Sequence, residues 1–131
     1  LGTLAARSPA IVAAIADVDA LVPMPLHPVR AAARGFNQSL EIAHWLGRSV
    51  GKPLAPGLLC RLRDTPPQVG LDATARRANV AGAFAASRNC RGLRLALVDD
   101  VVTSGASSGE AAAALCANGA NRVSVVAIAR A

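Results

Sequence analysis

The sequence predicts an α/β domain with a mainly parallel central sheet flanked by helices. Short apolar runs suited to buried strands alternate with amphipathic or Ala-rich stretches suited to helices, in the order βαβ…βαβ. This order indicates parallel strands whose ligands bind at their carboxyl ends. With 131 residues, 53% of them hydrophobic, we expect one domain over 1–131 with a substantial core.

Each expected element follows from its residues. Ser8 and Pro9 fit the N-cap and first turn of a helix. Asn37 or Ser39 can cap a second helix, whose apolar positions recur at helical spacing until Gly51. The apolar stripe of this second helix consists of Leu40, Ile42, Ala43, Leu46 and Val50. In chain order we expect a helix over 10–16, a strand over 19–24, a loop over 25–36, a helix over 37–50, extended segments over 53–62 and 80–84, a buried strand over 93–102, a helix over 107–117 and a strand over 122–129.

The most informative segment is 95–107, which contains LALVDDVVTSGAS. An apolar strand delivers Asp99 and Asp100, and a loop of small residues then opens a helix. Backbone N–H groups at a helix N-terminus favour a phosphate. Carboxylates beside that loop suit sugar hydroxyls or a bound Mg²⁺. The segment therefore predicts a site for a phosphorylated sugar, and a buried strand with a solvated Asp-Asp turn is the plainer alternative.

This segment resembles the phosphoribosyl pyrophosphate (PRPP) motif of type I phosphoribosyltransferases: a hydrophobic strand, two acidic residues and a Thr/Ser-Gly loop. The resemblance implies that Asp99 and Asp100 are the catalytic pair, holding the ribose 2′ and 3′ hydroxyls, and that both are Mg²⁺ ligands. It also implies a 5′-phosphate site in the loop. The implied phosphate-binding residues are Thr103, Ser104, Gly105, Ala106 and Ser107.

Two further stretches are chemically informative. Residues 22–38, VPMPLHPVRAAARGFNQ, place arginines after a strand, which fits either a second anion site or a solvated basic turn. Residues 63–79 form a long polar stretch with two prolines, which fits either a functional loop or a mobile insertion. His27 in the first stretch is a weak ligand candidate, and His44 is expected to be structural or to face solvent.

Together with the closing Gly-Ala…Ala-Arg, these stretches resemble the ComF family from Asp19 to Arg130. ComF proteins are phosphoribosyltransferase-like and linked to bacterial DNA uptake and competence, and their Gram-negative relatives include GntX-type proteins. They usually carry an N-terminal four-cysteine zinc element. That element is absent here, so we expect a shortened start.

The resemblance makes 25–36 the pyrophosphate loop, with Arg30 and Arg34 as contacts. It makes 63–79 a flexible loop that closes over the site, with Arg76 or Arg77 reaching the pyrophosphate. The implied reaction is displacement of pyrophosphate from PRPP by a nitrogen base, with Mg²⁺. No residue can be assigned to the base, so a non-catalytic PRPP- or nucleotide-binding protein, or an accessory protein of DNA uptake, remains the alternative.

The amino-acid composition indicates which classes of ligand and partner the chain could bind. The net charge is +6, and thirteen of the fourteen basic residues are Arg, which fits phosphorylated ligands, nucleic acid or a GC-rich coding sequence. No Tyr, one Trp and two Phe provide little stacking surface for single strands. The scattered Cys60, Cys90 and Cys116 predict core thiols in a reducing cytoplasm. We expect no membrane span, and a homodimer is a candidate assembly.

Overall fold

The structure is a computed structural model, which describes residues 9–26, 29, 32–33, 35–63, 70, 72–102 and 105–130. Its elements are, in chain order, α2 (Pro9–Ile15), β1 (Ala20–Pro23), α4 (Gln38–Val50), η1 (Pro56–Leu58), β2 (Leu59–Arg61), α5 (Ala73–Val80), β3 (Phe84–Ala86), η2 (Arg88–Cys90), β4 (Arg94–Val102), α6 (Ala106–Ala117) and β5 (Arg122–Arg130).

A parallel sheet in the order β1-β4-β5 forms the centre of the molecule. The register pairs Ala20 of β1 with Leu95 of β4, and Leu95 with Val123 of β5. Leu54 extends the sheet by one parallel bridge to Leu21 on the outer side of β1. This arrangement confirms the α/β class and the parallel sheet expected from the sequence. The short antiparallel pair β2-β3 lies apart from this sheet.

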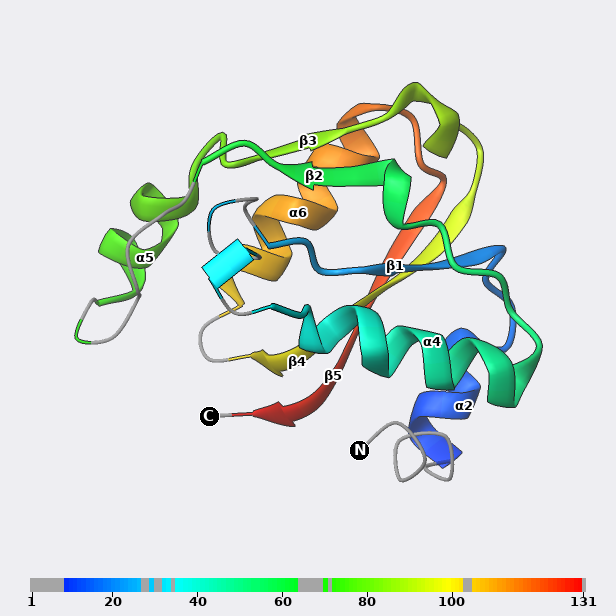
Figure 1. The fold of residues 1–131 in the computed structure, drawn as a ribbon. Helices are drawn as coiled ribbons and strands as arrows, with labels where there is room; N and C mark the ends of the chain where they lie inside the picture. The colour runs from blue at the N-terminus through cyan, green and yellow to red at the C-terminus, as the bar shows by residue number, and fades with distance from the viewer. Residues whose placement is uncertain are drawn as a thin grey trace.

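Helices and the β2-β3 pair cover opposite faces of the sheet (Figure 1). On one side, α2 and α4 pack against the sheet, and apolar contacts between Leu46 and the strand residues Ala96 and Val98 belong to this layer. On the other side, α6 and the β2-β3 pair bury Leu115 and Phe84 with the remaining β4 side chains. Because β4 is central and buried on both faces, its continuous apolar run is explained.

The starts of the helices agree with the sequence in most cases. Asn37 caps α4, and its side-chain oxygen accepts from the N–H groups of Ser39 and Leu40. Ser39 itself is not the cap. Leu40 was expected in the buried stripe but is 39% exposed, because the helix turns it away from Ile42 and Leu46.

The stretch over 63–79 is where the sequence expectation was wrong. Its second part is the helix α5, which Asp72 caps by accepting from the N–H of Ala75. Val80 ends this helix, so the extended segment begins only at Phe84. Residues 64–69 and 71 lie outside the described part of the chain, so the expected loop mobility stays a prediction.

The thiols divide into two kinds. Cys90 is buried and its Sγ lies 3.5 Å from the Leu115 carbonyl oxygen, as expected for a core thiol. Cys60 and Cys116 are exposed, which corrects the expectation that all three are core residues. None of the described helices has the length and apolar character needed to cross a bilayer.

Candidate functional site

The acidic pair lies near the carboxyl end of the central strand. Asp99 and Asp100 are the sixth and seventh residues of β4, which ends at Val102. The neighbouring strand β1 ends at Pro23, in register with Val98. The strand ends, the start of α4 and the start of α6 all lie at the same side of the molecule in Figure 1. This is the edge at which parallel α/β sheets bind ligands.

Asp99 is a buried carboxyl group with few donors around it. Its side chain is 9% exposed, and Asp100 beside it is half-buried. The Oδ1 atom accepts from the backbone N–H of Asp100 at 2.9 Å and from the Ser39 hydroxyl at 3.5 Å. Burial, followed by the adjacent Asp100 carboxyl, raises the pKa of Asp99 from 3.8 to about 7. A pKa shifted this far in a group near a strand end is typical of a functional site.

Ser39 reaches Asp99 because the start of α4 is tied to the end of β1. The Asn37 side-chain amide donates to the Met24 carbonyl at 3.1 Å while its oxygen caps the helix. This places the first turn of α4 beside β4, and Ser39 is 4% exposed there. The sequence suggested Ser39 only as a cap. Its position in the first turn of a helix that follows a strand could have identified Ser39 as a site residue, because such turns lie at the edge of the sheet where ligands bind.

The expected phosphate loop ends in a glycine with a left-handed backbone. Gly105 has φ of +79° and occupies the N-cap position of α6. Gly105 has no side chain with which to cap the helix, and the first turn of α6 contains no acidic residue. Ser108 is 5% exposed and donates to the Gly105 carbonyl at 3.3 Å, which holds the turn closed. Thr103 and Ser104 lie outside the described residues.

The helix α5 carries two of the predicted arginines. Arg76 is half-buried, and its Nε is buried without a hydrogen-bond partner among the described residues. Arg77 is exposed in the last turn of the helix. The turn after α5 is tied to α6, because the Gly82 N–H donates to the Glu110 carboxylate at 3.0 Å. The structure thus brings α5 against α6, the helix that follows the phosphate loop.

Arg63, at the start of the 63–79 stretch, is bound locally, since its guanidinium donates to the backbone carbonyls of Asn79 and Ala81 at the end of α5. The remaining predicted residues are placed as follows. Arg30, Arg34 and His27 lie outside the described part of the chain. His44 is exposed on α4, as expected.

The donor set at the strand end suits a magnesium ion shared with a ligand. Among the described residues, no group of three or more His, Cys, Asp and Glu side chains forms a metal cage. Asp99 and Asp100 provide two carboxylates. Mg²⁺ is commonly held by one or two carboxylates together with substrate phosphates and water, so the pair fits such a shared ion.

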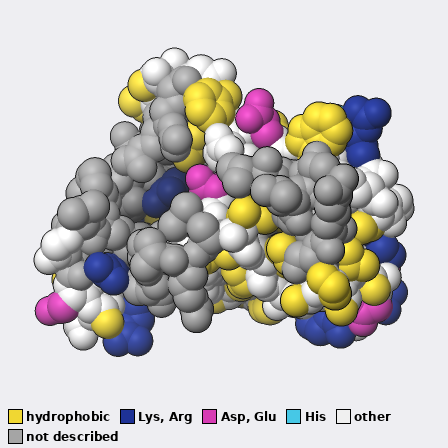
Figure 2. All heavy atoms as spheres, turned by 90° about the horizontal axis from the view of Figure 1, so that it is seen from below, with side chains coloured by type: hydrophobic (Ala, Val, Ile, Leu, Met, Phe, Trp, Pro, Cys, Tyr) yellow, Lys and Arg dark blue, Asp and Glu magenta, His cyan; other side chains and the backbone are white. Residues whose placement is uncertain are grey.

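Positive charge is not concentrated on the face shown in Figure 2. There, the described Lys and Arg side chains occupy several separate places, with acidic side chains between some of them. Two arginines are neutralised locally, by the Arg94–Asp19 pair at 3.2 Å and the Arg122–Asp17 pair at 2.7 Å. The described residues of this face therefore form no continuous basic surface for a nucleic-acid backbone.

Sequence comparison finds relatives among bacterial DNA-uptake and DNA-utilisation proteins. The chain is 39% identical over 111 residues to the DNA utilization protein YhgH of Salmonella typhi, covering 82% of this chain and 47% of that protein. It is 36% identical over 116 residues to Competence protein F of Haemophilus influenzae, covering 86% of this chain and 51% of that protein. The chain thus spans about half the length of these relatives. No family model matches the chain.

Two solved structures share the fold. One is the glutamine PRPP amidotransferase from B. subtilis, complexed with ADP and GMP, with a TM-score of 0.62 and 22% identity. The match covers 96% of this chain and 24% of that chain. The other is a purine phosphoribosyltransferase from Pyrococcus horikoshii, with a TM-score of 0.60 and 14% identity, covering 98% of this chain and 71% of that chain. Both matches confirm the expected phosphoribosyltransferase-like fold.

Proposed function

We propose that the chain is a member of the ComF family with a type I phosphoribosyltransferase fold, and that it binds PRPP at the carboxyl end of β4. The observation that carries the proposal is the buried Asp99 beside Asp100, at the strand end that precedes the glycine turn of α6. Ribose hydroxyls are donors, and a carboxylate pair accepts from two neighbouring hydroxyls. Relatives named for DNA utilisation and competence share the sequence, and enzymes named for PRPP share the fold.

In this proposal, Asp99 and Asp100 hold the ribose 2′ and 3′ hydroxyls. The neighbouring Ser39 hydroxyl keeps Asp99 oriented. Burial and the neighbouring Asp100 carboxyl raise the pKa of Asp99 to about 7 in the free protein. Two hydroxyl donors favour the ionised form, so binding of the sugar releases a proton from this group.

The loop 103–107 receives the 5′-phosphate in this proposal. The positive end of the α6 dipole and the backbone N–H groups of the turn favour an anion there. Gly105 permits the backbone to approach the phosphate closely, because its φ of +79° is one that other residues adopt at a cost. A branched side chain at this position would both strain the turn and crowd the phosphate.

Arginines face the pyrophosphate group in this proposal. Arg76 has a buried Nε that lacks a partner among the described residues, so an anionic ligand would satisfy it. Arg77, Arg30 and Arg34 are the further candidates. Negative charge grows on pyrophosphate as its bond to ribose C1 breaks, and guanidinium groups stabilise that charge. When bound at Asp99 and Asp100, Mg²⁺ supplies further neutralisation of the leaving group.

The reaction proposed is transfer of phosphoribose to a nitrogen base, with release of pyrophosphate, in the cytoplasm. The second candidate function is a non-catalytic PRPP- or nucleotide-binding accessory protein of DNA uptake. The names of the relatives favour this second candidate, since both refer to DNA use or competence. Residues 1–131 are proposed to act as one domain in either case.

Calorimetry with PRPP, in the presence and absence of Mg²⁺, tests the binding step. We expect Mg²⁺-dependent heat from the parent and a large loss of affinity in Asp99→Asn. The matched control is Asp17→Asn, which removes an exposed carboxylate near the opposite edge of the sheet. The absence of heat at millimolar PRPP in both conditions contradicts the proposal. Pyrophosphate release across a panel of nucleobases then separates the enzyme from the non-catalytic binder.

A further inference from the structure

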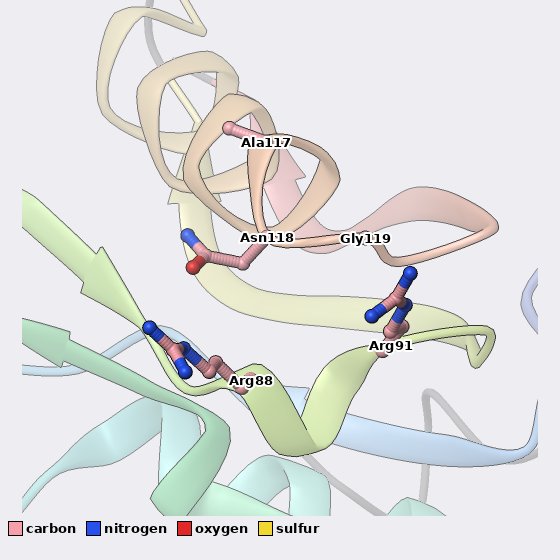
Figure 3. A pocket seen from close by; sticks show the side chains of 5 residues that line it. All are labelled: Arg88, Arg91, Ala117, Asn118 and Gly119. Atoms are coloured by element: carbon pink, nitrogen blue, oxygen red, sulfur yellow. The ribbon is translucent and has the colours of Figure 1, made fainter.

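A hollow in the surface lies near the amino ends of β4 and β5, at the edge of the sheet opposite the acidic pair. It has a volume of about 400 Å³ and is lined by Arg88, Arg91, Ala117, Asn118 and Gly119. Figure 3 shows the two arginines rising from the η2 turn toward the end of α6, with Asn118 directed toward Arg88. The volume falls within the range of small-ligand sites.

The η2 turn presents both arginines on one side. Arg88 begins this turn and Arg91 follows its last residue, Cys90, so the two arginines flank the turn. Cys90 between them is fully buried and anchors the turn to the end of α6 through Leu115. The Ser87 side chain caps the turn by accepting from the Asn89 N–H at 3.2 Å. The two guanidinium groups thus project from a fixed base.

Arg88 and Arg91 have no acidic partner among the described residues, unlike two other arginines at this edge of the sheet. Arg94 and Arg122 each form an ion pair, with Asp19 and Asp17. Among the described residues, neither Arg88 nor Arg91 takes part in a salt bridge, and no Asp or Glu lines the hollow. Two guanidinium groups facing one hollow without an acceptor favour an anionic ligand.

The end of α6 does not use these arginines as caps. Backbone N–H groups of the following turn already donate to the last helix carbonyls, including those of Ala114, Leu115 and Cys116. The Asn118 side-chain amide also donates to the Ala114 carbonyl at 2.9 Å. These carbonyls are already occupied within the turn, and both arginines are exposed, so their guanidinium groups are available to a ligand from solution.

Gly119 keeps the hollow open next to Arg91. Its φ is +102°, and a Cβ atom at this position would lie 3.0 Å from Cγ of Arg91. Any other residue would therefore press on the stem of that arginine. The glycine lets the arginine run along the turn and bring its guanidinium to the hollow, as Figure 3 shows.

We propose that this hollow binds a phosphate group, carried by a free nucleotide or by the phosphodiester backbone of a single-stranded nucleic acid. Arginine forks match the oxygens of phosphate in geometry and charge. The five residue-to-residue steps from Arg94 to Asp99 span roughly 17 Å of strand, so this site is separate from the proposed PRPP site. The proposal therefore stands or falls independently of PRPP binding.

The test follows the backbone N–H signal of Gly119 and the side-chain amide signal of Asn118 in ¹H–¹⁵N NMR spectra. The probes are AMP and an oligothymidylate, titrated at low salt. We expect saturable shifts of both signals in the parent and at least a tenfold weaker response in Arg88→Ala/Arg91→Ala. The Gly105 signal reports the proposed PRPP site in the same spectra, so binding at the two ends is distinguished.

A charge-matched control removes two positive charges from the other face of the sheet. Arg48→Ala/Lys52→Ala changes the α4 side, outside the hollow, and should keep the response. For the oligonucleotide, loss of two phosphate contacts should reduce the slope of log affinity against log salt by about 1.4. Shifts with AMP alone identify a free nucleotide as the ligand, and a stronger response to the oligonucleotide identifies the backbone. Equal responses from the parent and the Arg88/Arg91 variant, or an equal loss in the control, overturn the proposal.

Discussion

Replacing Asp99 by Asn is expected to stabilise the free protein at alkaline pH. The carboxyl group is 9% exposed, and among the described residues its donors are the Asp100 N–H at 2.9 Å and the distant Ser39 hydroxyl. Asparagine has nearly the same shape and carries no charge. The substitution therefore removes the cost of ionising a buried carboxyl beside a second one.

The magnitude follows from the pKa of Asp99, which is about 7 in the folded chain and 3.8 in an unperturbed aspartate. The folded state binds this proton more tightly, so the stability that the group contributes is present below pH 4 and is lost as the pH rises through 7. The parent loses roughly 4 kcal/mol of stability over the whole transition, of which about 3 kcal/mol is lost between pH 5 and pH 9. The free energy of unfolding of Asp99→Asn, minus that of the parent, should therefore rise by about 3 kcal/mol between pH 5 and pH 9.

Urea unfolding of both proteins at one-unit steps from pH 5 to pH 9 measures this difference. Asp17 and Asp19 have a lowered pKa because of their arginine partners, so their contributions are present above pH 4 and are lost only at lower pH. Those contributions are the same in both proteins and cancel. A difference that stays constant within about 0.5 kcal/mol over this range would show that Asp99 is not held with a raised pKa, and the reasoning about its burial would fail.

Three further predictions concern residues around the same edge. Ser39→Ala should weaken PRPP binding by about tenfold, measured by calorimetry, because it removes a donor to the ionised carboxylate, while the exposed Ser49→Ala should leave binding unchanged. Gly105→Val should lose both PRPP and ribose 5-phosphate and should lower the free energy of unfolding by about 1–2 kcal/mol, since φ is +79° there; retained binding of either ligand contradicts the proposed phosphate loop. Asn37→Ala should cost about 1 kcal/mol of stability in urea unfolding through loss of the α4 cap, and Asn37→Ser should recover most of it; equal stability of all three proteins would contradict the capping role.

Strands were the most predictable part of the fold. The apolar run that ends at Asp99 has no polar residue between Leu95 and Val98, so it could only suit a strand buried on both faces or a buried helix. The adjacent carboxylates and small-residue loop then identified the strand end. The helix α5 escaped prediction because its polar sequence, ATARRANV, shows weak apolar periodicity, although Asp72 was available as a cap.

The partners of the site residues were not predictable in the same way. Ser39 and Asp99 are 60 residues apart, and their contact depends on where α4 crosses the sheet. The position at which α4 crosses the sheet cannot be read from the sequence, because it results from the packing of Ile42 and Leu46 against β4. The carboxyl pair could be named from the sequence, but its protonation state depends on burial and on this neighbour.

The pairing of β1 with β4 affects how the chain folds while it is being synthesised. The backbone N–H of Arg94 donates to the Asp19 carboxylate, across 75 residues of chain, and β1 gains its partner strand only at this point. At a synthesis rate of about 5–20 residues per second, β1 waits roughly 4–15 s for β4 to be made. During that time the apolar faces of β1 and α4 lack the central strand that covers them. Folding is therefore governed by late, long-range closure around β4, which favours slow refolding and a need for protection of the nascent amino-terminal half.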